Sequence, residues 1–189
     1  MDEVDRIIIS QLQQDGRTTL QELAKATGFT SMGIKKRIQR LLARDTIKVS
    51  ALINPDSLNL FPAIVLLEIE SAEATQRLLE RFKNCPRVVH IFQTIGGYNL
   101  IALVVAEDKD TLESISMEKC SLRSGAGIRR SEFFPIGDIH FSPFLQIREH
   151  LTHKEKTVAP CNVDCLPCTR YETKKCAGCP TTTHYRGTL

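Results

Sequence analysis

The sequence predicts an α+β fold, in which an N-terminal winged helix-turn-helix is followed by a ferredoxin-like βαββαβ domain and a short cysteine-rich tail. Apolar residues recur at helical spacing within the first fifty residues, and from Phe61 the pattern changes to alternating and β-branched runs. Five of the seven cysteines fall within nineteen residues near the C-terminus. The expected boundaries are 1–50 for the first domain, 51–60 for a linker strand, 61–142 for the second domain, and 143–189 for linker and tail.

The composition fits a globular protein and excludes a membrane-spanning helix. The 189-residue chain is 42% hydrophobic and 25% charged, and it lacks an apolar run of about 18 residues, which such a helix needs. The first residues, MDEVDRIII, are acidic rather than basic, so we expect no signal peptide. We therefore expect a cytoplasmic protein with reduced thiols that serve as metal ligands or buried side chains.

Positive charge is concentrated in one part of the first domain. Residues 1–50 and 146–189 each have a net charge of +3, whereas residues 51–145 have −3. Within 31–50 there are six basic residues and one acidic residue. This local charge favours a polyanionic partner such as DNA, although a solvated helix face would have the same composition.

The first helix is predicted from an apolar stripe among acidic residues. Asp2, Glu3 and Asp5 suit the N-terminus of a helix because its dipole favours negative charge there. Asp15-Gly16 ends the helix. The stripe itself, at helical spacing, comprises Val4, Ile7, Ile8 and Leu12.

Two further helices follow at the spacing of a helix-turn-helix. A capping-box pattern begins at Thr18 or Thr19 and predicts a helix over 20–27, which Gly28 ends. Thr30 can cap a third helix that runs to about residue 44. Two short helices separated by a tight glycine turn form the helix-turn-helix arrangement.

The third helix has the division that a helix reading the major groove needs. Its apolar residues gather on one side, where they would pack on the first two helices, and long hydrogen-bond donors lie on the other side. A helical bundle with an incidentally basic surface is the alternative. Residues 47–53 are expected to form an extended wing strand, which Asn54-Pro55-Asp56 ends. The candidate DNA-contacting residues are Thr30, Ser31, Met32, Lys35, Lys36, Arg37, Gln39, Arg40 and Arg44.

The middle of the chain predicts a split βαβ unit. Strands are expected over 63–69, 88–94, 100–106 and 128–135, with a helix over 72–83 between the first two. Gly96-Gly97 makes the tight turn between the second and third strands. A second helix is expected to be capped by Asp110, with Leu112, Ile115 and Leu122 on its apolar side. The order β-α-β-β-α-β is that of the ferredoxin-like fold.

The order and spacing of these elements over residues 1–142 resemble the Lrp/AsnC (feast–famine) transcriptional regulators. The resemblance rests on the helix-turn-helix, the linking strand, the βαββαβ domain and its Gly-Gly-Tyr-Asn hairpin turn. It implies a regulator that binds double-stranded DNA, forms homodimers and higher oligomers through the second domain, and binds small effectors. The effector-contacting residues that it implies are Gly96, Gly97, Tyr98 and Asn99. The family pattern commonly has Asp where this chain has Asn99, and Gly where it has Asp45.

A second, enzymatic interpretation remains open at this point. Proteins similar in architecture to the Lrp/AsnC regulators act as sirohaem decarboxylases. In that case His90, Arg129, Arg130 and His140 would be the acid–base or propionate-binding candidates. The basic third helix and the cysteine tail argue against this interpretation, so we expect a regulator rather than an enzyme, with no catalytic residues.

The cysteine tail is the most specific local signal. A short segment with too few apolar residues for its own core can obtain its folding energy from a bound metal. A polar linker at 150–156 precedes it, and Cys85, Cys120 and His184 are expected to be packing or surface residues. The expected metal ligands, in the pattern C-x3-C-x2-C-x7-C-x2-C-P, are Cys161, Cys165, Cys168, Cys176 and Cys179.

Two kinds of metal site fit this pattern. Zinc would take four thiolates, Cys165, Cys168, Cys176 and Cys179, and leave Cys161 spare. An iron–sulfur cluster would take the first three cysteines of the tail and a fourth from either of the last two, and we slightly favour it because of the additional thiol. The tail would then sense metal or redox state; the alternative is a purely structural zinc clip.

Overall fold

The computed structural model describes residues 1–147 and 154–189, which form two compact units, residues 1–51 and 52–189. The polar linker predicted at 150–156 lies outside the described residues as far as residue 153. Within the described residues, no helix is both long and apolar enough to cross a membrane.

The first unit is a bundle of three helices, α1 (Glu3–Gln14), α2 (Leu20–Thr27) and α3 (Ser31–Ala43). The first two begin with reciprocal capping boxes, and the Thr30 side chain caps α3. Gly28 ends α2 in the left-handed conformation, as the glycine turn predicted. The apolar stripes meet in a small core, whose fully buried residues are Ile8, Leu23 and Ile34.

The end of α3 forms a Schellman motif. The Thr46 amide donates to Leu41 O at 2.9 Å, the Asp45 amide donates to Leu42 O at 3.0 Å, and Asp45 has a left-handed φ of 50°. This is the conformation for which glycine is usually selected. The expected wing strand is not present: residues 47–52 have no regular structure, and Ile53, which already belongs to the second unit, forms an isolated bridge with Leu145 of that same unit. A strand requires a partner, and the described residues of the first unit supply none.

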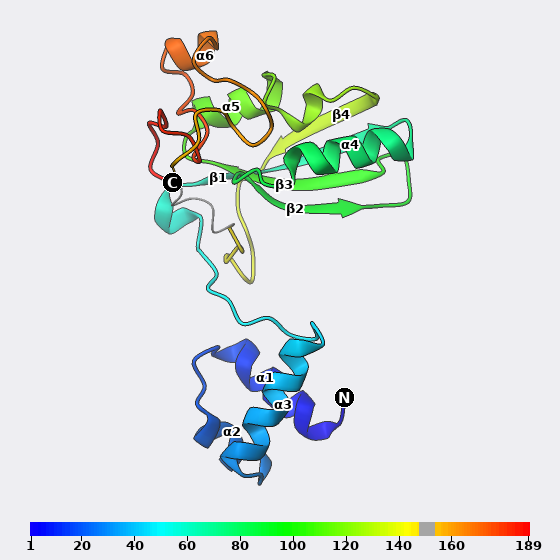
Figure 1. Ribbon diagram of the computed structural model, residues 1–189, viewed down its shortest axis with the longest axis vertical. Coiled ribbons are helices and arrows are strands. Elements are labelled where there is room, and N and C mark those ends of the chain that lie inside the picture. Colours follow the sequence, from blue (N-terminus) through cyan, green and yellow to red (C-terminus); the bar gives the residue numbers. More distant parts are fainter. Residues whose placement is uncertain (148–153) are drawn as a thin grey trace. The chain divides into compact units, whose positions relative to one another are not determined.

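The second unit contains an antiparallel four-stranded sheet with strand order β2-β3-β1-β4, the arrangement predicted for a βαββαβ domain. Both main helices, α4 and α5, lie on the same side of this sheet (Figure 1). The strands are β1 (Phe61–Ile69), β2 (Val88–Gln93), β3 (Leu100–Ala106) and β4 (Ile128–Pro135), and the helices are α4 (Ala72–Phe82) and α5 (Lys109–Met117). Short 3-10 turns occupy Asp56–Leu58 and Leu122–Ser124.

Two details of α5 differ from the prediction. Its cap is Asp108, whose carboxylate accepts the Thr111 amide at 2.6 Å, and Asp110 lies inside the first turn. The helix ends at Met117, so Leu122 belongs to the following 3-10 turn rather than to the helix. Both acids precede the apolar stripe, and only the backbone conformation at residue 108 distinguishes the cap.

The two faces of the sheet differ in burial. On β1 the side chains that face the helices are buried, whereas the alternating residues on the other face remain half-buried. Strand register places the open-face side chains opposite one another, so Ile64 pairs with both Leu103 and Phe134. The apolar open-face residues, called the open sheet face below, are Ile64, Leu66, Phe92, Ile101, Leu103 and Phe134.

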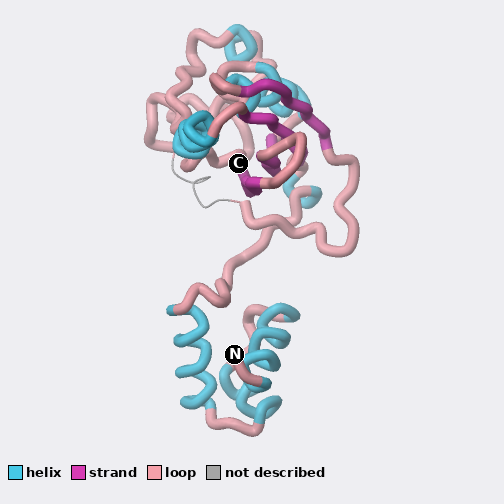
Figure 2. Tube along the Cα trace, turned by 90° about the vertical axis from the view of Figure 1, so that its right-hand side faces the viewer, coloured by secondary structure: helices cyan, strands magenta, loops and turns pink. Residues whose placement is uncertain are grey.

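The C-terminal tail packs on the helix side of the second unit. Its only described helix is the one-turn α6 (Thr169–Glu172), and the remainder is loop (Figure 2). Lys156 and Thr182 form an isolated parallel bridge that brings the two ends of the tail together. Ala159, Tyr171 and three tail cysteines are buried in the same hydrophobic core as the sheet and helices. The tail is therefore an integral part of this unit and not an appendage.

Candidate nucleic-acid interface and thiol cavities

The exposed side of α3 carries a short row of hydrogen-bond donors. Ile34 and Leu41 are buried on the opposite side and fix the helix against α1 and α2. Lys and Gln side chains at helical spacing can contact both phosphates and base edges. The exposed row, called the α3 front face below, comprises Met32, Lys35, Lys36 and Gln39.

Two arginines predicted to contact DNA are instead held by α1. Arg37 Nη1 lies 2.7 Å from Asp2 Oδ2 and 2.8 Å from Asp5 Oδ1, and Arg40 Nη2 lies 3.1 Å from Asp5 Oδ2. The Arg37 side chain is 20% exposed and that of Arg40 is 45% exposed. The helical-wheel prediction placed Arg40 on the front face, but its guanidinium turns toward the acidic start of α1.

Asp5 is the buried centre of this ion-pair network. Burial opposes its ionisation, yet the hydrogen bond from Arg37 and the other polar contacts hold the pKa of its carboxyl below the usual value. Asp2, with a backbone hydrogen bond from Asp5 and a side-chain bond from Arg37, has a lowered pKa as well. The network thus couples the start of α1 to the middle of α3.

The other predicted DNA contacts lie at the two ends of α3. Thr30 Oγ1 accepts the Gly33 amide at 3.1 Å, so this side chain is engaged in capping. Ser31 is the first residue of the helix and is half-buried, and Arg44 is exposed at the C-terminal end.

The hairpin between β2 and β3 places Asn99 against β1. Its Oδ1 accepts the Ile69 amide at 2.8 Å, and its Nδ2 donates to Ile69 O at 2.7 Å. The backbone amide of Asn99 also donates to Leu67 O at 3.0 Å. The Asn99 side chain therefore extends the sheet pairing, which a carboxylate could not do because it cannot donate to the Ile69 carbonyl.

Tyr98, the next predicted effector residue, bonds to β4. Its hydroxyl donates to Glu132 Oε1, and the Arg130 guanidinium lies 4.9 Å from the centre of the tyrosine ring. Burial and the hydrogen bond to Glu132 raise the pKa of the Tyr98 hydroxyl. Glu132 also lines an open groove of about 920 Å³ between α5 and β4. Gly96 and Gly97 are exposed at the tip of the hairpin.

All seven cysteines of the chain lie in the described residues, and all seven are reduced and line one of two cavities with shared walls. The inner cavity has a volume of about 50 Å³ and the outer about 280 Å³. The inner cavity is lined by Cys85, Cys120, Cys161, Cys165, Cys176 and Cys179. The outer cavity is lined by Cys120, Cys165, Cys168 and Cys176.

Sequence reasoning missed Cys85 and Cys120, which it treated as packing residues. Cys85 follows α4 and Cys120 follows α5, and neither has a neighbouring cysteine in the sequence that would have revealed its position. Within the described residues, no group of three Cys, His, Asp or Glu side chains stands ready to hold a single metal ion. The cysteines therefore share cavities without forming a closed coordination shell.

Burial sets the protonation of these thiols. It raises the pKa of Cys85 to about 11 and that of Cys120 to about 12, and neighbouring thiols add to both shifts. The pKa of Cys165 is raised to about 11 for the same main reason. These three thiols are consequently neutral near pH 7 when they bind nothing.

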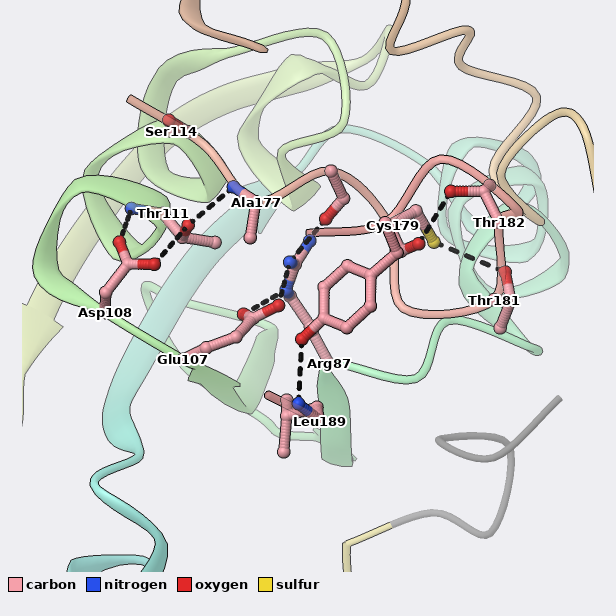
Figure 3. Close-up of polar contacts among 12 residues, drawn as sticks. Arg87, Glu107, Asp108, Thr111, Ser114, Ala177, Cys179, Thr181, Thr182 and Leu189 are labelled. Atoms are coloured by element: carbon pink, nitrogen blue, oxygen red, sulfur yellow. Dashed lines mark hydrogen bonds and ion pairs between the residues drawn. The ribbon is translucent and has the colours of Figure 1, made fainter. Parts of the chain in front are cut away.

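A buried ion pair attaches the tail beside the inner cavity (Figure 3). Arg87, which precedes β2, pairs with Glu107, which follows β3, with Nε–Oε2 at 3.0 Å. These side chains are 8% and 2% exposed. Arg87 also donates to Gly178 O in the tail. Although burial disfavours its charge, the adjacent Glu107 carboxylate raises the pKa of Arg87.

Further polar contacts join the tail to α5. The Ala177 amide donates to Thr111 Oγ1 at 3.0 Å (Figure 3), and Ser114 Oγ donates to Lys175 O at 2.9 Å. Arg170 Nη2 lies 2.7 Å from Glu113 Oε2. The cysteine loops between these anchors are therefore fixed over the gap between α4 and α5.

The four residues that the enzymatic interpretation would use lie on the exposed surface of the described structure. His90, Arg129, Arg130 and His140 are exposed, and Arg130 is paired with Glu132 at 2.5 Å. His184 packs against the Tyr171 ring and does not line either thiol cavity.

Comparison with protein families gives two matches. Residues 1–42 match the AsnC-type helix-turn-helix domain, and residues 62–134 match the Lrp/AsnC ligand binding domain. The tail lies beyond both matches. These families consist of transcriptional regulators and not of enzymes.

Individual relatives agree with this assignment. An uncharacterized HTH-type transcriptional regulator of Pyrococcus furiosus is 30% identical over 116 residues, which are 59% of this chain and 75% of the relative. LrpA of Mycobacterium tuberculosis is 28% identical over 156 residues, 80% of this chain and 97% of LrpA. The crystal structure of LrpA superposes with a TM-score of 0.65 at 25% identity, covering 78% of this chain and 100% of LrpA. A Neisseria meningitidis regulator, solved as an L-Met complex, shares the fold with a TM-score of 0.67 at 20% identity. The superposition covers 75% of this chain and 93% of the Neisseria chain.

Proposed function

The chain belongs to the Lrp/AsnC family of DNA-binding transcriptional regulators, and we propose that it recognises a specific operator sequence through the α3 front face. The observation that carries this proposal is the exposed row of Lys35, Lys36 and Gln39 on a helix whose opposite side is buried. Lysines supply the attraction to phosphates, and Gln39 and Lys36 supply hydrogen bonds to base edges. The reduced thiols agree with a cytoplasmic protein.

The nine residues predicted to contact DNA divide into groups. In this proposal the front face carries the base-edge contacts together with the lysine contacts to phosphates, and Arg44 adds a further phosphate contact. The half-exposed Arg40 can reach a phosphate only by sharing its guanidinium with Asp5, and Arg37 mainly supports α3 from behind. Thr30 and Ser31 place the N-terminus of α3, with its free amide groups, toward a phosphate.

We further propose that the protein acts as a homodimer through the open sheet face. This face is apolar and half-exposed, with Phe92 54% and Phe134 48% exposed. Apolar patches of this kind on a sheet favour a self-complementary two-fold interface. A dimer would present two copies of α3 to successive major grooves about one helical turn apart, so we expect a short, imperfect palindrome as the operator.

The DNA-binding proposal is tested by the titration of promoter fragments at several salt concentrations. Lys36→Ala and Gln39→Ala should each weaken specific binding by about tenfold, since one base-edge contact is worth about 1–3 kcal/mol. Lys36→Ala should also reduce the salt dependence by about one released counterion. Arg6→Ala is the matched control, because it removes an equal charge from an exposed position on α1. Unchanged affinity in both front-face variants would contradict the proposed face.

We also propose a small-molecule effector at the β2–β3 hairpin, Gly96, Gly97, Tyr98 and Asn99. The ligand-binding domain match supports an effector, and the L-Met complex of the Neisseria regulator shows that one protein with this fold binds an amino acid. The groove beside Glu132, to which Tyr98 bonds, would extend the site. A thermal-shift screen of amino acids should find a stabilising compound whose effect disappears in Tyr98→Phe.

Finally, we propose that the tail cysteines bind metal, as an iron–sulfur cluster in preference to zinc, and that the loading of this site reports metal or redox state to the regulator. The support is the spacing of the five tail cysteines and their burial beside the core. A purely structural zinc clip is the alternative. Iron, sulfide and zinc analysis of anaerobically purified protein distinguishes the two.

A further inference from the structure

The starting observation is that cysteines from three separate parts of the chain meet at the same place. Cys85 follows α4, Cys120 follows α5, and the other five belong to the tail. They are separated by up to 94 positions in sequence, yet each lines one of the two thiol cavities. Three of them, Cys120, Cys165 and Cys176, line both cavities and form a wall that the cavities share.

The inner cavity has the properties of a ligand site. Apart from Arg87, its remaining side chains are apolar and come from the sheet, from α4 and α5, from the 3-10 turn after α5 and from the tail, so a group bound there would be shielded from water. Its volume of about 50 Å³ corresponds to about three or four water-sized atoms. The apolar wall comprises Val65, Phe82, Val88, Val104, Ile115, Leu122 and Ala159.

Among the described residues that line the inner cavity, Arg87 has the only charged side chain. Its guanidinium is held by Glu107 and by Gly178 O, next to Cys179. A buried positive group beside several sulfurs suits an anionic metal–thiolate group. The Arg87–Glu107 pair also fixes the loop that carries Cys176 and Cys179 (Figure 3).

Thiols are soft ligands, and they select zinc, cuprous ion or iron–sulfur clusters over hard cations. One zinc ion would use four of the seven thiols. An iron–sulfur cluster also takes four cysteines, but it binds them at its periphery, so its ligands lie farther apart than those of a single ion. Within the described residues no three of these side chains are close enough to share one ion, and this wider spacing favours the cluster.

We propose that Cys85 and Cys120 of the ligand-binding domain supply two of the four ligands of an iron–sulfur cluster, and that two tail cysteines of the inner cavity supply the others and hold the cluster over the gap between α4 and α5. This inference rests on the proposed metal binding of the tail and adds its ligands and its chemical class. The cluster then joins the tail directly to the domain that binds effector. Binding of the cluster would hold the tail against α4 and α5, and loss of the cluster would remove that restraint.

The test uses the full-length protein, purified without oxygen. Iron and acid-labile sulfide are measured per chain, with the visible absorption spectrum, for the wild type and for the double variant Cys85→Ser/Cys120→Ser. Ile115→Val, which trims the wall of the same cavity without changing a sulfur, is the matched control. Cys161→Ser/Cys165→Ser reports on the tail alone, and circular dichroism verifies folding.

We expect the wild type and Ile115→Val to contain iron and sulfide in equal amounts, and the Cys85→Ser/Cys120→Ser variant to lose at least half of both. A second measurement needs no variant: alkylation of Cys85 and Cys120 in the wild type should become at least tenfold faster after the cluster is removed with a chelator and oxidant. The single variants then show which of the two cysteines contributes more.

Three results would overturn the inference. One is colourless protein with one zinc per chain. Another is full iron content in Cys85→Ser/Cys120→Ser when Cys161→Ser/Cys165→Ser has lost it, which would leave a metal site in the tail alone. The third is equal iron loss in Ile115→Val. Operator binding by the same samples is measured separately, so a failure to bind DNA contradicts the proposed regulator without affecting the cluster result.

Discussion

At the residue scale, Asn99 shows how one side chain can serve the fold at a position where the family pattern implies effector contact. Its amide satisfies both polar groups of Ile69 on β1. The sequence revealed the departure from the usual Asp but not its consequence, because that depends on a partner thirty positions away. The contact of this hairpin with an effector stays a prediction.

We predict that Asn99→Asp destabilises the second unit by about 1–3 kcal/mol, because the carboxylate would face the Ile69 carbonyl without a proton to donate. Urea denaturation of the full-length protein at pH 7 measures the effect. Asn99→Ala, which removes the side chain without adding charge, is the comparison. Equal stability of Asn99→Asp and wild type would show that the hydrogen bond from Asn99 Nδ2 to Ile69 O contributes nothing.

The ion pair of Arg87 and Glu107 is a second contact that sequence reasoning could not predict. The two residues lie at the ends of neighbouring strands, and nothing local distinguishes them from solvated charges. Removal of one partner leaves the other as an unpaired buried charge. Arg87→Met should therefore lower the unfolding free energy by about 3–5 kcal/mol. Replacement of both, in Arg87→Met/Glu107→Leu, should restore most of that loss. Additive losses in this double-mutant cycle would contradict a direct coupling.

At the element scale, helix and strand positions follow closely from periodicity and capping residues. The predicted 20–27 and 100–106 segments coincide with α2 and β3. The errors fall where a local pattern allows two outcomes: Asp108 and Asp110 can both cap α5, and an extended segment at 47–53 becomes a strand only if a partner is present. Tertiary contacts select between such outcomes, and sequence spacing does not contain them.

The contact between α1 and α3 leads to a pH prediction for the first unit. Because the pKa of Asp5 is lower in the folded state than in the unfolded chain, its ion pairs stabilise the unit above the unfolded pKa of about 4. That contribution is lost as the pH falls through the folded value. We therefore expect the unfolding free energy of the helical unit to decrease below pH 4.

The variant Asp5→Asn tests this assignment. It should be less stable than the wild type at pH 7, by about 1–3 kcal/mol because Arg37 and Arg40 lose their shared partner, and the difference should narrow as the pH approaches 3. Asp15→Asn, at an exposed acid paired only with Arg17, is the control. A constant difference between pH 7 and pH 3 would show that Asp5 is not the group responsible.

At the scale of the whole molecule, the chain joins a family architecture to a tail that the family matches do not include. Both matches end by residue 134, yet the tail contributes Ala159, Tyr171 and Ala177 to the buried residues of the second unit. The cysteine spacing predicted a separate module that needs metal to fold. The apolar and polar contacts instead place the tail in the core of the ligand-binding domain, which a count of its few apolar residues could not anticipate.

These contacts imply that deletion of residues 158–189 damages the second unit even in protein stripped of metal. The deletion would uncover helix-facing side chains such as Val65 and Val88 and leave the Arg87–Glu107 pair open to water. Since each large apolar side chain is worth about 1.5–3 kcal/mol when buried, the loss in unfolding free energy should be about 3–6 kcal/mol. The first unit shares no core with the tail, so its helices should melt as in the intact chain.

Denaturation of metal-free samples, followed by tyrosine fluorescence for the second unit and by far-ultraviolet circular dichroism for the helical content, separates the two transitions. If the truncated and intact metal-free proteins unfold at the same urea concentration, the tail gains its order from metal alone and its contacts with the core are not stabilising.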